Sequence, residues 1–90
     1  MKINVTLRDI YNGDFSNPRS FYCPVALAVR RATYQRDVEV NHTYIKCWID
    51  GYKLLRTPYK VARFIRNYDL GGWRRFLFCW PFSFELEVPE

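Results

Sequence analysis

Outside the C-terminal aromatic segment, the most continuous apolar run of the chain starts at Cys23 and continues until Arg30. Good helix formers fill this run, and Pro24 stands at the first helical position, where the missing N–H of a proline costs no helical hydrogen bond. The pattern predicts a helix from Pro24 to about Thr33 that is covered on more than one side. Only Arg30 and Arg31 need to reach water.

Alternation of apolar and polar positions predicts the strands. Strands are expected over residues 2–6, 37–41, 44–49, 52–55 and 76–88. Asp50-Gly51 is a strong turn signal, so the third and fourth of these segments form a hairpin. The last segment has aromatic or aliphatic side chains at every second position, and it forms one strand or two strands broken at Pro81, because proline cannot donate to a central ladder.

Capping signals predict two further helices. Thr6 with Asp9 three residues later indicates a short helical turn, which Asn12-Gly13 would end in the left-handed conformation. Thr57-Pro58 combines a side-chain cap with a proline at the first helical position, and Gly71-Gly72 would end this longer helix. Its buried face consists of four apolar or aromatic residues: Val61, Phe64, Ile65 and Tyr68.

Length and composition place these elements in one domain. A chain of 90 residues buries roughly two-thirds of its unfolded surface, which is enough for one core. The expected fold is a single α+β domain, residues 1–90, with an antiparallel sheet of four or five strands packed by two main helices. No uncharged apolar run approaches the roughly 18 residues of a membrane span, and the N-terminus does not resemble a secretion signal. We expect a cytoplasmic protein without membrane contact.

Basic residues are concentrated in one part of the chain. The net charge is +5, but residues 53–75 hold seven basic residues and one acid, a local balance of +6. On a helical wheel Tyr59, Arg63 and Arg66 fall within about 60° of one another, opposite the predicted buried face. Arginine binds phosphate through paired hydrogen bonds and stacks on bases, and tyrosine stacks as well. This combination suits nucleotides or single-stranded nucleic acid.

Three neighbouring residues extend this candidate site: Trp73, Arg74 and Arg75. Arg30 and Arg31, at the end of the first long helix, complete the set of candidate ligand-binding residues. The alternative interpretation is a solvated basic helix face in front of core aromatics, because a basic patch favours nucleic acid without proving it.

Cys23 is a further candidate for chemistry. At the start of a helix, the unpaired amides and the helix dipole favour a thiolate, which would suit a nucleophile, and the same amides could instead hold an anion. Against a nucleophile, the chain has one histidine, His42, and no Cys-x-x-Cys pair. A buried cysteine is usually a small hydrophobic residue, so we favour a structural role. We expect no catalytic residue, no metal site and no cofactor.

The C-terminal segment offers more alternating aromatic surface than one strand of a small sheet normally buries. Part of it is therefore expected to contact a second subunit or another protein, and a homo-oligomer is the simplest form of such contact. The alternative is a sheet face covered by both long helices.

Four short motifs occur along the chain: a Thr-x-x-Asp-Ile-x-x-Gly turn, a Cys-Pro-Val-Ala-Leu-Ala helix, a Pro-x-x-Val-x-x-Phe-Ile helix and a terminal Pro-Phe-x-Phe-x-Leu strand, starting at Thr6, Cys23, Pro58 and Pro81. Together they resemble a family of small phage-encoded or prophage-encoded accessory proteins of unassigned function. The chain differs from that family by its longer segment over residues 72–80. The resemblance implies a protein that binds and disables a host component, and it implies no catalytic residue.

Two functional hypotheses follow. The first is a non-enzymatic, counter-defence protein that captures an anionic host component, such as a nucleotide immune signal or nucleic acid. The second is an inhibitor that binds a host defence protein through the aromatic C-terminal segment. A Cys23-dependent enzyme is a weaker third hypothesis.

Overall fold

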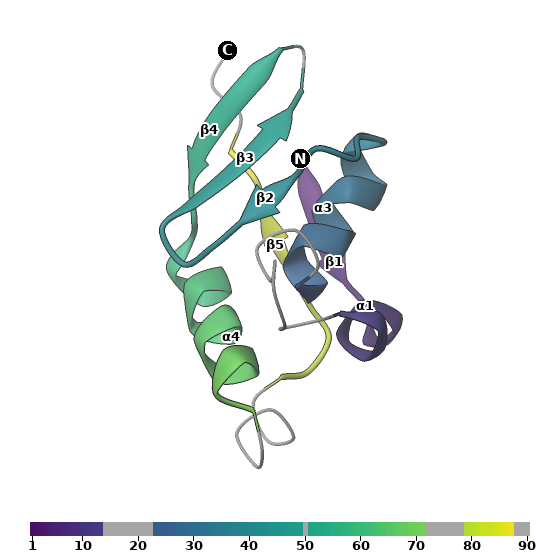
Figure 1. Ribbon diagram of the computed structural model, residues 1–90, viewed down its shortest axis with the longest axis vertical. Coiled ribbons are helices and arrows are strands. Elements are labelled where there is room, and N and C mark those ends of the chain that lie inside the picture. Colours follow the sequence, from purple (N-terminus) through teal and green to yellow (C-terminus); the bar gives the residue numbers. More distant parts are fainter. Residues whose placement is uncertain (14–22, 50, 72–78, 88–90) are drawn as a thin grey trace.

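A computed structural model describes residues 1–13, 23–49, 51–71 and 79–87. Their elements follow the order β1 (Lys2–Val5), α1 (Leu7–Asn12), α3 (Pro24–Thr33), β2 (Glu39–Val40), β3 (Tyr44–Trp48), β4 (Tyr52–Arg56), α4 (Tyr59–Leu70) and β5 (Phe82–Glu85). The domain measures 40 × 22 × 21 Å. Figure 1 shows the β3–β4 hairpin at one end of the long axis and α4 and α1 toward the other. The α+β class predicted from the sequence is confirmed.

The two ends of the chain pair with each other. Strands β1 and β5 are antiparallel, with Ile3 opposite Phe84 and Val5 opposite Phe82. Ile3 and Val5 are almost fully buried, as the alternation at the N-terminus predicts. The amide of Leu86 donates to the carbonyl of Met1 at 2.8 Å, which extends the pairing beyond the strand ends.

The second sheet has the order β2-β3-β4, and all its pairs are antiparallel. The predicted hairpin around Gly51 is confirmed, and this glycine has a φ of 106°, a conformation that side chains other than glycine rarely adopt. One face of the hairpin carries Ile45, Cys47 and Leu55 into the core. The other face is turned outward.

The five strands form two sheets, whereas the sequence suggested one. Helix α3 contacts β1 and also β2 and β3, and so it lies between the sheets and joins them (Figure 1). Val25, Ala26 and Val29 at the centre of this helix have no measurable exposure. An apolar surface around most of the helix allows it to pack against both sheets at once, which the breadth of its apolar stripe had indicated.

Helix α1 begins as predicted but ends differently. Thr6 and Asp9 form a reciprocal capping box, while Gly13 is extended, with a φ of −64°, and not left-handed. Its role is close approach: a Cβ at this position would lie 2.7 Å from ring carbons of Pro24. Glycine is therefore needed here for space and not for a positive φ.

Helix α4 begins two residues after Thr57, without the side-chain cap that the sequence suggested. Thr57 directly follows β4 and bonds to the turn between β2 and β3, because its amide donates to the carbonyl of Thr43 and its Oγ1 donates to the carbonyl of Asn41 at 2.8 Å. Pro58 takes the N-cap position instead. The buried face is confirmed, with Val61, Phe64, Ile65 and Tyr68 all buried.

The C-terminal segment is interrupted at the predicted proline. Strand β5 starts just after Pro81, and the alternation changes phase there, because Cys79 is buried while Trp80 is 59% exposed. Phe84 and Leu86 are buried in this chain's own core. Of the described helices, none is long and apolar enough to span a membrane.

Candidate anion-binding groove on helix α4

The three helix residues singled out from the sequence lie on one side of a groove. Tyr59, Arg63 and Arg66 line it together with His42 and part of the last turn of α4, and its volume is about 590 Å³. This is within the roughly 300–1,000 Å³ typical of ligand sites. Below, this hollow is called the α4 groove; its lining residues are His42, Tyr59, Ala62, Arg63, Ile65, Arg66, Asp69 and Leu70.

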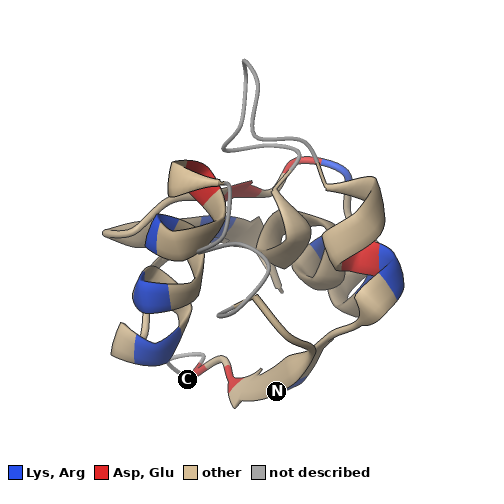
Figure 2. Cartoon of the chain, turned by 90° about the horizontal axis from the view of Figure 1, so that it is seen from below, with Lys and Arg blue, Asp and Glu red and all other residues tan. Residues whose placement is uncertain are grey.

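The amphipathic pattern of α4 explains why these side chains point outward. Phe64 and Tyr68 fix the rotation of the helix: the Phe64 ring packs 4.8 Å from the Phe82 ring, and the Tyr68 hydroxyl donates to the carbonyl of Gly13 at 2.8 Å. The opposite face is left to solvent, and Tyr59 is 82% exposed. Figure 2 shows basic positions recurring along α4 on the outside of the molecule, away from α1.

His42 reaches the α4 groove from a different element. It lies in the turn between β2 and β3, where the side-chain oxygen of Asn41 accepts hydrogen bonds from the amides of Thr43 and Tyr44 at 2.8 and 2.9 Å. This side-chain turn fixes the backbone around His42. No pattern in the sequence places His42 at this site, because its proximity to α4 depends on how the sheet and the helix meet.

The guanidinium groups of the groove are available for a ligand. Among the described residues, neither Arg63 nor Arg66 has a hydrogen bond or ion pair. The groove also contains one carboxylate, that of Asp69, which is half-buried. Two arginines and one aspartate leave the site with a net positive charge. A phosphate is expected to bind at Arg63, because Arg63 is farther from Asp69 along the helix than Arg66 is.

The other predicted site residues do not join the groove. Trp73, Arg74 and Arg75 lie outside the described residues. Arg31 is engaged within the chain: its guanidinium forms a two-bonded ion pair with Asp9 and donates to the carbonyl of Asn4. Arg30 is half-buried and does not line the groove. The candidate site is therefore reduced to α4 and the β2–β3 turn.

Cys23 occupies the predicted helix cap, and its surroundings favour the structural role. The thiol sulfur accepts from the amide of Ala26 at 3.5 Å, and only 3% of the residue is exposed. Burial raises the pKa of this thiol to about 11. At neutral pH it is thus a buried neutral thiol, which is a poor nucleophile.

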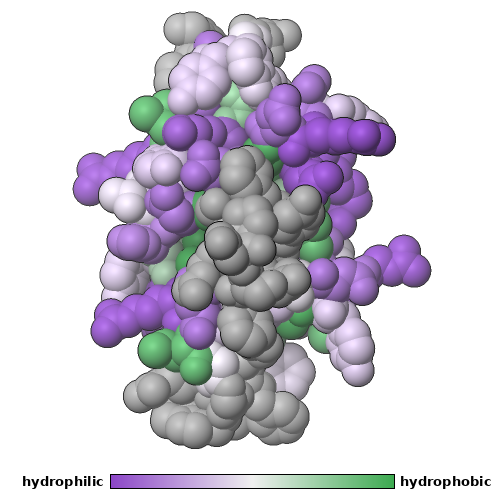
Figure 3. Space-filling view, viewed as in Figure 1, coloured by the Kyte–Doolittle hydropathy of each residue, from purple (hydrophilic) through white to green (hydrophobic). Residues whose placement is uncertain are grey.

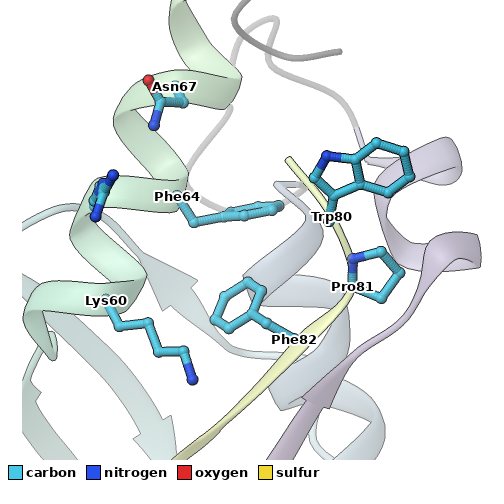
Figure 4. A pocket seen from close by; sticks show the side chains of 7 residues that line it. Lys60, Phe64, Asn67, Trp80, Pro81 and Phe82 are labelled. Atoms are coloured by element: carbon cyan, nitrogen blue, oxygen red, sulfur yellow. The ribbon is translucent and has the colours of Figure 1, made fainter. Parts of the chain in front are cut away.

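A second, smaller hollow lies on the other side of Arg63, between α4 and β5. It has a volume of about 240 Å³ and is lined by aromatic rings and two cations. Figure 4 shows Phe64 of α4 on one side of this space and Trp80, Pro81 and Phe82 on the other, with Lys60 at its edge. The Lys60 ammonium donates to the carbonyl of Ser83 at 2.9 Å and lies 5.7 Å from the Phe82 ring centre.

The outer face of the β3–β4 hairpin is a further exposed surface, which was not among the sites predicted from the sequence. Three cross-strand pairs point away from the core there, and we call them the hairpin face: Tyr44 with Arg56, Lys46 with Leu54, and Trp48 with Tyr52. Trp48, Tyr52 and Leu54 are 44%, 52% and 58% exposed. The sequence does indicate such a surface. When apolar residues occupy both alternating sets of positions in a strand, one set packs into the core and the other set forms an apolar face outside it.

Among the described residues, no three histidine, cysteine, aspartate or glutamate side chains are close enough to hold a metal ion. The chain matches no family model, no curated protein and no solved structure.

Proposed function

We propose that this chain is a non-enzymatic binding protein that captures a phosphate-containing ligand, a nucleotide or nucleic acid, in the α4 groove. The observation that carries the proposal is the presence of Tyr59, Arg63 and Arg66 in one groove of about 590 Å³. Arginine supplies charge-assisted hydrogen bonds to phosphate, and an exposed tyrosine beside it supplies a surface for a base.

The resemblance of four short motifs to phage accessory proteins is our reason for proposing a host component as the ligand. A protein of 90 residues that removes a nucleotide signal by binding needs affinity and abundance, and it needs no catalytic group. Counter-defence in the host cytoplasm is the biological role that we propose on this basis.

The test is equilibrium binding of thymidine triphosphate to the wild-type chain and to Arg63→Gln, measured by isothermal titration calorimetry. Loss of one charge-assisted contact is expected to weaken binding on the order of tenfold. Arg8→Gln is the matched control, because Arg8 is exposed on α1 and the substitution removes the same charge. Equal losses in both variants, or no binding by the wild type, would argue against the α4 groove.

A second candidate function is inhibition of a host protein through the C-terminal segment. The observation in its favour is the exposed Trp80 next to the aromatic hollow in Figure 4, because exposed tryptophans in such settings often anchor protein interfaces. This candidate, like the homo-oligomer, predicts a complex that Trp80→Ala disrupts while nucleotide binding is retained. Size-exclusion chromatography with light scattering, applied to the wild type and to Trp80→Ala, distinguishes this candidate function from nucleotide capture.

A further inference from the structure

The hairpin face combines aromatic rings with basic groups on an exposed sheet surface. The rings of Trp48 and Tyr52 are 5.5 Å apart in an edge-on arrangement, and the Lys46 ammonium lies 5.2 Å from the Tyr44 ring centre. Pale side chains of intermediate hydropathy gather at the upper end of Figure 3, where Figure 1 places the far end of β3 and β4. The Trp48 and Tyr52 residues remain 44% and 52% exposed.

Charge and edge geometry help to identify what this face binds. Arg56 is exposed and has no ion pair or hydrogen bond within the described part of the chain. Lys46 is paired with Glu39 at 3.3 Å, so the hairpin face and its neighbour β2 together remain positive. Strand β4, which is an edge strand among the described residues, also carries Lys53 and Arg56, and like charges there oppose pairing with a second copy of the chain.

The hairpin face is continuous with the α4 groove. Leu54 and Arg56 line a cavity of about 740 Å³ that also includes His42 and Tyr59, and these last two residues line the α4 groove as well. Glu85 and Glu87 belong to the same cavity, so a phosphate backbone is expected to pass on the side of Arg56 and His42. The exposed aromatic and basic groups thus follow one path along the molecule.

We propose that the hairpin face is a stacking platform for the bases of a single-stranded nucleic acid whose phosphates reach the α4 groove. This inference rests on the proposed function of the groove and names its ligand class: an oligonucleotide in place of a mononucleotide. Aromatic side chains on open sheet faces stack successive bases in this way in other single-strand binding domains. Outward positions two residues apart in a strand are roughly 6.7 Å apart, which allows rings from adjacent pairs to receive separate bases.

The experiment compares Leu54→Glu with Leu7→Glu. The two leucines are 58% and 59% exposed, and both substitutions add the same negative charge, but Leu7 lies on α1, away from the path. Leu54→Glu keeps the Trp48–Tyr52 pair, so the hairpin is expected to fold, and far-UV circular dichroism checks this. Fluorescein-labelled single strands of about 12 nucleotides, oligo-dT and oligo-U, serve as probes in fluorescence anisotropy.

We expect Leu54→Glu to weaken oligonucleotide binding on the order of tenfold and thymidine triphosphate binding much less, while Leu7→Glu binds both probes like the wild type. The DNA and RNA arms show which backbone is preferred. If the triphosphate binds with Arg63 dependence but Leu54→Glu has no effect on the oligonucleotide, the platform is wrong and the groove stands. If neither probe binds the wild type, both proposals fail. If Leu54→Glu converts a dimer to a monomer without affecting the oligonucleotide, the face is a self-association surface and the inference is overturned.

Discussion

Arg31 of α3 holds the carboxylate of Asp9 in α1 through two hydrogen bonds of 2.6 and 2.8 Å, and the same carboxylate accepts from the amide of Thr6 at 2.8 Å. Asp9 is 3% exposed, whereas the Arg31 side chain is 51% exposed. The pair therefore connects the two helices around a buried acid. A residue that the sequence offered as a ligand contact is used to stabilise the fold.

The first prediction concerns acid stability. Burial alone would raise the pKa of Asp9, but the hydrogen bonds from Arg31 and Thr6 outweigh it, so the pKa lies below its usual value. A carboxyl whose folded pKa is depressed contributes stability above its unfolded pKa and loses it as the pH falls through the folded value. We expect the free energy of unfolding in urea to fall as the pH drops below about 4.

Arg31→Met tests the origin of this effect. The variant retains burial of the Asp9 carboxyl but loses its main hydrogen-bond donor, so the pKa of Asp9 is expected to rise toward its unfolded value and the acid-induced loss of stability to become smaller. The cost at neutral pH should be about 1–3 kcal/mol, the penalty for leaving a buried acceptor poorly paired. A carboxyl NMR titration of Asp9 that is unchanged in the variant would contradict this account.

The second prediction concerns Tyr34, which ends α3 in the left-handed conformation with a φ of 58°. Side chains other than glycine are strained there, and Tyr34 is 93% exposed, so its ring contributes little packing. Tyr34→Gly is expected to stabilise the protein by about 1 kcal/mol in thermal unfolding. Tyr34→Val is the contrasting variant. It should be less stable than the wild type, because a β-branched side chain is more strained in the left-handed conformation.

The third prediction concerns Gly13. Gly13→Ala places a methyl group 2.7 Å from the ring carbons of Pro24, so one of these two residues must shift. The expected loss is about 1–3 kcal/mol, as for other overpacked sites. Because the carbonyl of Gly13 also accepts from Tyr68, Tyr68→Phe in the same background should cost less than it does in the wild type. Additive losses would show that the two contacts are independent.

Local signals in the sequence were enough to place most elements. The helix of Pro24–Thr33 has the bounds that its proline and its apolar run predict, and the hairpin around Gly51 follows from its turn residues. What the sequence does not encode locally is how the strands divide. Two sheets result because α3 has an apolar surface wide enough to separate them, and this is a property of packing, not of periodicity.

The candidate site was predictable to the same extent. Tyr59, Arg63 and Arg66 share a helix face, so their spacing alone brings them together. His42 and the hairpin face belong to elements whose position relative to α4 depends on the tertiary fold. Arg31 shows the converse, because its partner Asp9 is 22 residues away and no local pattern links them.

The fourth prediction uses charge of both signs in the α4 groove. Arg66→Gln is expected to weaken oligonucleotide binding, and Asp69→Asn is expected to strengthen it, because the latter removes the carboxylate that repels phosphate. The salt dependence of binding should weaken as well: the slope of log K against log salt becomes less negative by about 0.7 in Arg66→Gln if that residue contacts one phosphate of a single strand. Changes of the same sign in both variants would indicate a structural effect in place of an electrostatic one.

The most direct test of the central claim is the mapping of amide chemical shifts in the wild-type chain during titration with an unlabelled oligo-dT single strand. The account predicts that the largest changes fall on Tyr59, Arg63 and Arg66 and on the turn at His42, and that they extend to the hairpin face. Changes confined to α1 and α3, or a spectrum that stays unchanged at saturating oligonucleotide, would contradict it.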